Sequence, residues 1–347
     1  MSFKVLVEPS GLTFEVKAGQ NVLDAALAAD VMLPYSCRGG GCSTCKAKVV
    51  AGTYEAGEAS AHILDAHELE QGYTLMCQAC PTSDLRIESP QARLVTDIQV
   101  RKMPARVIQM EALSDDVMRV VLQLPVSQPV NYYAGQYIDI ILKDGRRRSY
   151  SMATPPQDNK QVELHIRHLP GGAFTDYVFG TSDPAMKERA MLRTEGPMGS
   201  FFLREESTKP LVFLASGTGF APIHAIIAQM QASNIQREIH FYWGGRRPKD
   251  IYLMAQAQQW AQTIPNFHFV PVVSEALPED GWSGRTGFVH EAVMADLTDL
   301  SGFEVYACGA PAMIENAQRD FVAQCGLDAA LFYADAFTSE AALAGSS

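Results

Sequence analysis

The chain has 347 residues, enough for two or three domains, and 47% of them are hydrophobic, an ordinary share for globular domains with buried cores. The net charge of −11 disfavours nucleic acid as a partner, because phosphate backbones need a basic surface. No apolar run approaches the roughly 18 residues of a membrane span, and the first residues lack the apolar core of a signal peptide. A cytoplasmic protein without a membrane span is therefore expected.

The first 90 residues are predicted to form a small β-rich domain. Residues 4–7 and 13–16 predict a hairpin, because β-forming residues flank a turn that contains proline, serine and glycine. Residues 21–29 have the apolar spacing of a helix, with Asn21 as its N-cap. Residues 85–88 predict a last strand, and the polar residues from Ser89 onward predict the start of a linker.

Five of the seven cysteines lie between Cys37 and Cys80, and in a long chain without a signal sequence such clustering indicates metal binding rather than disulfides. Four of the five have the C-x4-C-x2-C…C spacing of plant-type 2Fe–2S proteins. The predicted cluster ligands are Cys37, Cys42, Cys45 and Cys77. The glycines at 39–41 allow a short loop to wrap a compact cluster and bring backbone N–H groups near the sulfurs.

A structural zinc site is the alternative, because Cys42 with Cys45 and Cys77 with Cys80 make two C-x2-C pairs. If the cluster prediction is right, Cys80 is left over, and a buried small hydrophobe is its expected role. The lead-in Leu-Pro-Tyr-Ser-Cys at 33–37 and the cysteine spacing resemble plant-type ferredoxin domains, which implies a β-grasp fold for residues 1–90.

The remainder of the chain shows two different patterns. Short alternating runs at 117–124, 136–142 and 162–167 predict an antiparallel β-barrel. After residue 209, a buried strand at 211–215 is followed by a helix at 221–231 and a strand at 238–243. This alternation predicts an α/β domain with a parallel sheet.

Arg148-Ser149-Tyr150-Ser151 resembles the R-x-Y-S motif of ferredoxin–NADP reductase-like flavoproteins, which implies that these four residues bind FAD. The arginine is suited to clamp a phosphate through charge-assisted hydrogen bonds. The resemblance implies that Tyr150 stacks on the isoalloxazine ring and that Ser151 hydrogen-bonds near N5, where hydride arrives.

A second segment resembles the pyrophosphate-binding segment of the same family, in which glycines and helix N-terminal amides face an anion. Its predicted cofactor-binding residues are His165, Arg167, Gly171, Gly172 and Thr175. A catalytic role is not assigned to His165 or His168, because exposed histidines on strands and loops are common.

Two further motifs indicate a nicotinamide nucleotide site. The first is the segment Gly217-Thr218-Gly219-Phe220-Ala221-Pro222, which differs from the Rossmann G-x-G-x-x-G and resembles the G-T-G-x-A-P motif of the reductase family. The resemblance implies four cofactor-binding residues, namely Gly217, Thr218, Gly219 and Pro222. Cys308 and Gly309 resemble the C-G-x-P motif, whose cysteine lies against the nicotinamide in relatives. A buried core cysteine is the alternative for Cys308. The segment 332–337 resembles the terminal segment of oxygenase reductases, which implies that Phe337 covers the flavin face.

Over residues 3–337 the chain resembles iron–sulfur flavoprotein reductases, namely reductase components of bacterial aromatic-ring oxygenases and the CDP-6-deoxy-Δ3,4-glucoseen reductase type. The resemblance implies a ferredoxin domain at 1–90, an FAD-binding β-barrel at 104–205 and an α/β NAD(P)H-binding domain at 208–337. It also implies hydride transfer from NADH to FAD beside Ser151 and Cys308, the two predicted catalytic residues. Electrons would leave through the 2Fe–2S cluster to a protein acceptor, either an oxygenase component or a deoxysugar dehydrase.

Overall fold

The computed structural model describes residues 1–57, 63–125, 129–156 and 160–338, and the chain forms two compact units. The first unit contains Met1–Asp97, Gly199–Phe201 and the chain from Ala334 onward, and the second contains Ile98–Met198 and Phe202–Tyr333. Within the described ranges, no helix is long and apolar enough to cross a membrane.

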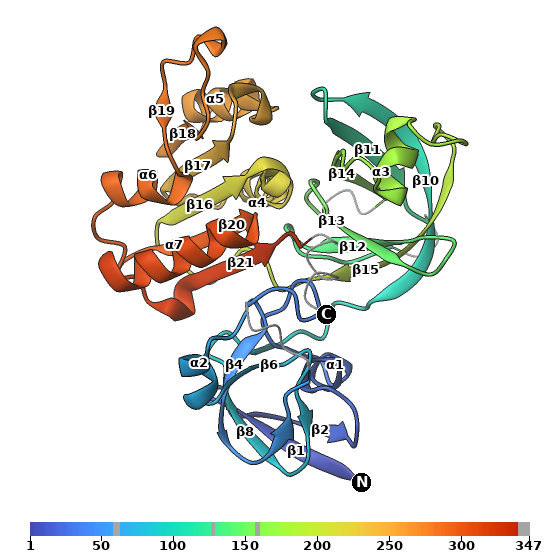
Figure 1. Ribbon diagram of the computed structural model, residues 1–347, viewed down its shortest axis with the longest axis vertical. Helices are drawn as coiled ribbons and strands as arrows, with labels where there is room; N and C mark the ends of the chain where they lie inside the picture. Colours follow the sequence, from blue (N-terminus) through green and yellow to red (C-terminus); the bar gives the residue numbers. More distant parts are fainter. Residues whose placement is uncertain (58–62, 126–128, 157–159, 339–347) are drawn as a thin grey trace. The chain divides into compact units, whose positions relative to one another are not determined.

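The first unit is built on a five-stranded sheet in the order β2-β1-β8-β4-β6 (Figure 1). Strands β1 and β2 form the predicted antiparallel hairpin, and β8 runs parallel to β1 at the centre of the sheet. The strands are β1 Ser2–Glu8, β2 Leu12–Lys17, β4 Lys46–Ala51, β6 Tyr73–Leu75 and β8 Leu85–Glu88. The predicted last strand is thus confirmed as β8.

Helix α1, Val22–Ala28, begins after Asn21, whose side chain accepts a hydrogen bond from the amide of Asp24. This confirms the predicted helix and its N-cap. The chain does not become a linker at Ser89, because Arg93–Leu94 pairs with Val31–Met32. The short elements of this unit are β3 Val31–Met32, β5 Tyr54–Glu55, α2 Ala66–Glu70, β7 Cys80–Pro81 and β9 Arg93–Leu94.

The first half of the second unit is the predicted antiparallel barrel, a six-stranded sheet in the order β13-β12-β15-β10-β11-β14. A bridge between Met152 and Leu164 joins its two edges. Its elements are β10 Arg101–Ala112, β11 Val117–Gln123, β12 Tyr137–Ile141, β13 Arg147–Ser151, β14 Gln161–Arg167, α3 Ala173–Phe179 and β15 Met191–Met198.

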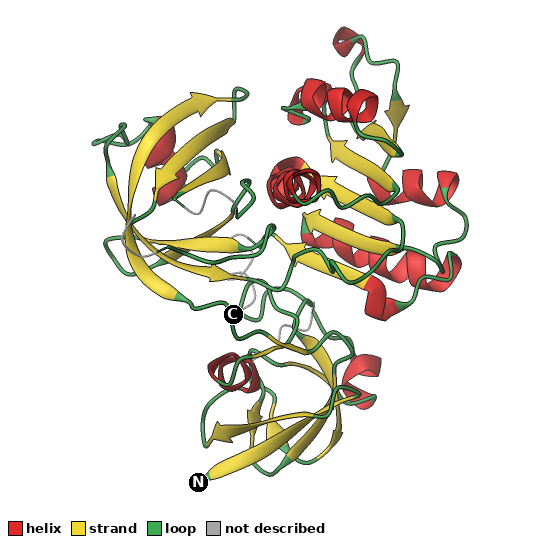
Figure 2. Cartoon of the chain, turned by 180° about the vertical axis from the view of Figure 1, so that it is seen from behind, coloured by secondary structure: helices red, strands yellow, loops and turns green. Residues whose placement is uncertain are grey.

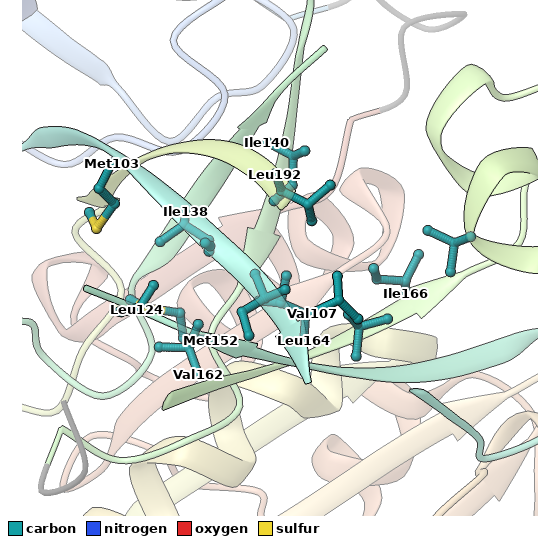
Figure 3. Close-up of a cluster of buried hydrophobic side chains, with 14 of the residues drawn as sticks. Met103, Val107, Leu124, Ile138, Ile140, Met152, Val162, Leu164, Ile166 and Leu192 are labelled. Carbon is teal, nitrogen blue, oxygen red and sulfur yellow. The ribbon is translucent and has the colours of Figure 1, made fainter. Parts of the chain in front are cut away.

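Side chains from five of the six strands and from their connections fill the barrel (Figure 3). Tyr150 on β13 packs against this core. Along β14, Val162, Leu164 and Ile166 are fully buried, as expected for every second residue of a strand with one face on the core. Burying one such side chain contributes roughly 1.5–3 kcal/mol. The barrel therefore holds β13, with its R-S-Y-S segment, in a fixed register against β12.

The second half of this unit is an α/β domain whose strands have the order β19-β18-β17-β16-β20-β21. The four pairs from β19 to β20 are parallel, and helices lie on both sides of the sheet (Figure 2). The strands are β16 Leu211–Ser216, β17 Ile239–Gly245, β18 Phe267–Val273, β19 Arg285–Thr286, β20 Glu304–Gly309 and β21 Phe332–Ala336. The helices are α4 Phe220–Ala232, α5 Met254–Thr263, α6 Val289–Asp296 and α7 Pro311–Gln324. Four short 3₁₀ turns complete it: η1 Gly217–Gly219, η2 Pro248–Asp250, η3 Pro278–Asp280 and η4 Ala329–Leu331.

Candidate functional site

The four predicted cluster ligands lie together in the first unit. Three of them come from the loop between β3 and β4, and Cys77 follows β6. Cys42, Cys45 and Cys77 are buried, whereas Cys37 is partly exposed. β4 and β6 are hydrogen-bonded neighbours, and their pairing brings the loop and Cys77 to the same place.

The four sulfurs are arranged as two pairs. The thiol of Cys45 donates to Cys77 across 3.4 Å. A hydrogen bond from Cys42, with further bonds from backbone amides, lowers the pKa of Cys37 to about 6. The hydrogen bond from Cys45 likewise lowers the pKa of Cys77. Each pair therefore contains one thiol whose pKa is below its ordinary value, and the thiolate is the form that binds iron.

This arrangement distinguishes the two metals that the cysteine spacing left open. A tetrahedral zinc ion would hold all four sulfurs about 4 Å from one another, since each Zn–S bond is about 2.3 Å. No three of the four sulfurs, all within the described residues, lie within 4.8 Å of one another. Two separate sulfur pairs suit a binuclear cluster, in which each iron takes two protein ligands. Residues 37–77 therefore fit a 2Fe–2S cluster.

The surroundings of the sulfurs also fit a cluster. Gly40 has a φ of +77°, and a Cβ there would come within 3.3 Å of the Gln78 side chain. The amide of Gly39 donates to the sulfur of Cys37 at 3.5 Å, and Nε2 of Gln78 donates to Cys77 at 3.8 Å. Cys80 is half-buried rather than buried as expected, and its thiol donates to the carbonyl oxygen of Gln78.

Residues far away in the sequence hold the segment that leads into the cluster loop. The hydroxyl of Ser200 accepts a hydrogen bond from the Tyr35 amide at 2.8 Å and donates to the Tyr35 carbonyl oxygen at 3.1 Å. Ser36 donates to Asp335 at 2.6 Å. The sequence analysis missed Ser200 and Asp335, because no local motif connects either residue with a loop so distant in the chain.

In the predicted flavin motif, alternate side chains of β13 have different surroundings. The hydroxyl of Ser149 donates to Asp139 at 2.6 Å, and Arg147 forms ion pairs with Asp139 at 3.1 Å and Glu195 at 2.6 Å. The intervening Tyr150 packs with its ring centroid 5.6 Å from that of Phe174. Burial raises the pKa of Tyr150, so its hydroxyl stays protonated.

Arg148 and Ser151 complete the motif. Nη1 of Arg148 donates to the carbonyl oxygen of Arg147, and its side chain is partly exposed. Ser151 is buried at the end of β13, opposite Tyr137 on β12. Arg148 and Tyr150 thus share one face of the strand, whereas Ser149 and Ser151 share the other.

The predicted pyrophosphate segment forms the turn before α3. A Cβ on Gly172 would lie 2.6 Å from Oγ1 of Thr175, so only glycine fits there without a shift. Thr175 donates to the carbonyl oxygen of Leu169 at 2.8 Å. The amide of Gly171 donates to Asp176 at 3.1 Å, which places a carboxylate where the resemblance places a phosphate.

The two nucleotide motifs meet between the neighbouring strands β16 and β20. A Cβ on Gly219 would lie 2.1 Å from the carbonyl oxygen of Cys308, and one on Gly309 would lie 2.2 Å from Oγ of Ser216. The amide of Ala310 donates to that same Oγ at 2.9 Å. Cys308 is fully buried within β20.

Arg167, at the end of β14, lies against the start of the Gly217–Gly219 turn. Its Nη1 is 2.9 Å from the position of a Cβ on Gly217. Its Nε is 3.2 Å from the Asp116 carboxylate, yet neither Nε nor Nη2 makes a hydrogen bond, although both atoms are buried. A buried guanidinium with unused donors is costly. An anionic group at this position, such as a nucleotide phosphate, would satisfy them.

His165 lies in a buried hydrogen-bond chain that joins the barrel to the α/β domain. Its Nε2 is 2.7 Å from Glu163, and its Nδ1 is 2.8 Å from the hydroxyl of Tyr252. Burial opposes ionisation of Glu163, but the hydrogen bond from His165 and the positive charge of Arg119 help to lower its pKa to about 2. Burial lowers the pKa of His165, so the neutral ring donates to Glu163 and accepts from Tyr252. The expectation of an exposed histidine was wrong, because Tyr252 and the α/β domain cover this part of β14.

His224 on α4 makes a second such connection. Its Nδ1 is 2.7 Å from the carbonyl oxygen of Ala153 in the barrel, and its Nε2 is 3.0 Å from Gln256. Burial lowers the pKa of His224 to about 4. No sequence motif marks His224, and the sequence analysis missed it.

The low pKa of His224 predicts an acid-sensitive second unit. The unfolded state binds a proton at pH values near 6.5, whereas the folded state takes one up only near pH 4. The stability due to neutral His224 is therefore complete above pH 6.5 and is lost as the pH falls through this range, by about 3 kcal/mol. His224→Gln keeps a side-chain amide donor but has no group that titrates. Between pH 7 and pH 4, we expect its free energy of unfolding to fall by about 3 kcal/mol less than that of the wild type. Urea unfolding at both pH values, with His67→Gln as an exposed control, measures this difference. Equal losses in all three proteins would contradict it.

Some oxidoreductases take hydride from a nicotinamide nucleotide onto a flavin and release electrons through a 2Fe–2S cluster. Such a protein needs one site each for the nucleotide, the flavin and the cluster, and this chain has a domain for each of them. It is an NAD(P)H-dependent iron–sulfur flavoprotein oxidoreductase. Residues 5–82 match the family model described as 2Fe-2S iron-sulfur cluster binding domain. Residues 104–203 match the oxidoreductase FAD-binding domain, and residues 213–319 match the oxidoreductase NAD-binding domain.

Several relatives align with this protein over nearly the whole of both chains. The chain is 39% identical to the CDP-6-deoxy-L-threo-D-glycero-4-hexulose-3-dehydrase reductase of Yersinia pestis over 97% of this chain and 99% of that protein. It is 34% identical to reductase component 1 of terephthalate 1,2-dioxygenase from Comamonas, over 98% of each chain. The crystal structure of the Amycolatopsis cytochrome P450 reductase GcoB superposes with a TM-score of 0.75 at 32% identity, covering 97% of this chain and 99% of that one. The chain belongs to this family of iron–sulfur flavoprotein reductases, and it transfers electrons from the nucleotide through FAD to the 2Fe–2S cluster.

Proposed function

We propose that this reductase uses NADH and delivers its electrons to the oxygenase component of an aromatic-ring oxygenase. The pairing of the four sulfurs supports electron transfer to the acceptor through the cluster, because a binuclear cluster carries one electron at a time and a zinc site carries none. The relative that is a reductase component of terephthalate 1,2-dioxygenase supports the class of acceptor. The cytoplasm is the proposed location, since a reducing compartment keeps thiolate ligands available.

The proposed nucleotide site lies around the Gly217–Gly219 turn. The unused donors of Arg167 and the amides of Gly217, Thr218 and Gly219 would hold the pyrophosphate, and Pro222 fits the first turn of α4, where its missing N–H leaves no bond unmade. Cys308 and Gly309 would border the nicotinamide, since Gly219 lies directly against the Cys308 carbonyl group.

The proposed flavin site lies along β13 and α3. Arg148 would hold a phosphate, protonated Tyr150 would pack against the ring system, and Ser151 would hydrogen-bond near the reacting nitrogen. The hydroxyl of Ser149 holds Asp139, so its part in the site would be through its backbone. Gly171, Gly172 and Thr175 would shape the turn at the second phosphate, and His165 would fix the barrel against Tyr252. When bound, FAD accepts two electrons as hydride and releases them one at a time.

We expect NADH to be preferred over NADPH. Arg247, a candidate partner for a 2′-phosphate, already pairs with both oxygens of Asp280, at 2.6 and 2.7 Å. Arg246 has an exposed side chain, and the buried Asp250 holds the amides of both arginines in place. Steady-state kcat/KM for the two nucleotides tests the preference. An NADPH advantage above about tenfold, or about 1.4 kcal/mol, would contradict it.

A deoxysugar dehydrase is the second candidate acceptor. The 39% identity to the Yersinia dehydrase reductase favours it, because the terephthalate reductase component is 34% identical. The two candidates differ in the protein surface that receives the electron, and neither changes the path within this chain.

Electron delivery to purified acceptors separates the two candidates. The NADH-reduced holoenzyme is mixed anaerobically with a Rieske-type oxygenase component and, separately, with a CDP-4-keto-6-deoxyhexose dehydrase. The proposal expects saturable reduction of the oxygenase component. Saturable reduction of the dehydrase alone would overturn the proposed acceptor in favour of the second candidate.

A further inference from the structure

Three potential metal ligands lie together on the α/β domain, away from the nucleotide motifs. His240 on β17 is the direct register partner of His268 on the parallel strand β18. Directly paired residues of neighbouring strands project to the same face of a sheet. Glu238 comes two residues before His240 and therefore lies on that face as well.

The three side chains converge. One donor atom from each of them lies within 4.8 Å of the other two. Nε2 of His240 is 2.8 Å from Oε1 of Glu238, and the rings of His240 and His268 stack with centroids 4.7 Å apart. Phe303 contacts the His240 ring edge-on, at 5.8 Å between centroids. His240 is partly buried, whereas Glu238 and His268 are exposed, so an ion from solvent can reach the group.

We propose that Glu238, His240 and His268 bind a divalent transition-metal ion such as Zn²⁺. Two imidazoles and a carboxylate form a donor set that suits zinc and its neighbours, whereas Mg²⁺ and Ca²⁺ prefer oxygen ligands alone. Ligand bonds of about 2.0–2.2 Å require the donors to approach one another more closely than 4.8 Å, which rotation of the two exposed side chains permits. The metal takes the place of the proton between His240 and Glu238, which is released to solvent, and a water molecule fills the fourth position.

The position of this site sets its role. The trio lies at the N-terminal ends of β17 and β18, whereas the Gly217–Gly219 turn and Gly309 lie at the C-terminal ends of β16 and β20. The two ends of a parallel sheet are separate, and nucleotides bind at the C-terminal end. A bound ion therefore ties β17 to β18 and stabilises the folded domain by mass action, without entering the nucleotide site.

Zinc binding to the holoenzyme, with iron and FAD in place, tests the proposal. Equilibrium dialysis followed by elemental analysis is expected to find one zinc per wild-type chain, with the iron content unchanged. His268→Ala and the conservative Glu238→Gln should each bind zinc at least about 100-fold more weakly, because loss of a direct ligand exceeds the usual effect of outer-shell changes. His67→Ala, which removes an exposed histidine of the first unit, should bind as wild type does.

Thermal unfolding supplies an independent readout. Added zinc should raise the unfolding temperature of the wild type and the His67 variant but not that of the His268 variant, and NADH–ferricyanide activity should not change. Failure of the wild type to bind zinc, or equal binding by wild type and the His268 and Glu238 variants, would overturn the proposal. Zinc uptake accompanied by loss of iron would do so too, because it would identify the cluster cysteines as the ligands.

Discussion

Cys42→Ser is expected to lose the iron–sulfur cluster. The rate of cytochrome c reduction should fall by at least about 100-fold, because removal of a direct ligand exceeds the usual effect of outer-shell changes. Cys42 is buried and pairs with Cys37, so a serine there puts a harder oxygen donor inside the cluster loop. The flavin and nucleotide motifs lie in the other compact unit and remain intact. Reduction of ferricyanide by NADH should continue at close to the wild-type rate, since a small oxidant takes electrons from the flavin directly.

Cys80→Ser is the matched control for this experiment. Cys80 lies in the same region but donates its thiol hydrogen to a carbonyl oxygen rather than to a cluster cysteine. The control should keep its iron and both activities. Full cytochrome c activity in Cys42→Ser would mean that electrons leave the protein without passing through the cluster.

Gly219→Ala is expected to lower kcat/KM for NADH by about 100-fold, with ferricyanide or cytochrome c as the acceptor. The new Cβ would lie 2.1 Å from the carbonyl oxygen of Cys308 and 2.6 Å from its carbonyl carbon. These are backbone atoms of the neighbouring strand, so the loop must move away from β20. A displacement of about 1 Å at a reacting group is enough for a loss of this size.

The control for this change is Gly302→Ala, because a Cβ at Gly302 has no neighbour within 4 Å. Both variants should retain iron and flavin, since the change at Gly219 affects only the nucleotide loop. A wild-type kcat/KM in Gly219→Ala would show that the contact between the two motifs does not position the nucleotide.

Local patterns in the sequence predicted most of the fold. The hairpin at β1 and β2, the Asn21 cap and the strand–helix alternation after residue 209 depend on neighbouring residues, and all three are confirmed. The cluster ligands could also be predicted, because the spacing of cysteines along the chain is a local pattern. The structure adds that their sulfurs form two pairs, which spacing does not show.

The contacts that the sequence did not reveal are long-range. His165 looked like an exposed strand residue, because nothing near it in sequence indicates that Tyr252 covers it. Ser200 and Asp335 hold the segment before Cys37 from 165 and 299 residues away in the sequence. His224 and the Glu238–His240–His268 group likewise depend on which strands and helices become neighbours. Such contacts follow from tertiary packing, and no local periodicity predicts them.

The order of electron transfer is the central claim, and rapid mixing with NADH under anaerobic conditions tests it most directly. The flavin is followed by its visible absorbance, and the reduced cluster by electron paramagnetic resonance of freeze-quenched samples. In wild type, the flavin absorbance is expected to fall first and the cluster signal to appear afterwards. In Cys42→Ser, the flavin absorbance should fall without a later cluster signal. A cluster signal that precedes flavin reduction, or flavin reduction that never produces a cluster signal in wild type, would contradict it.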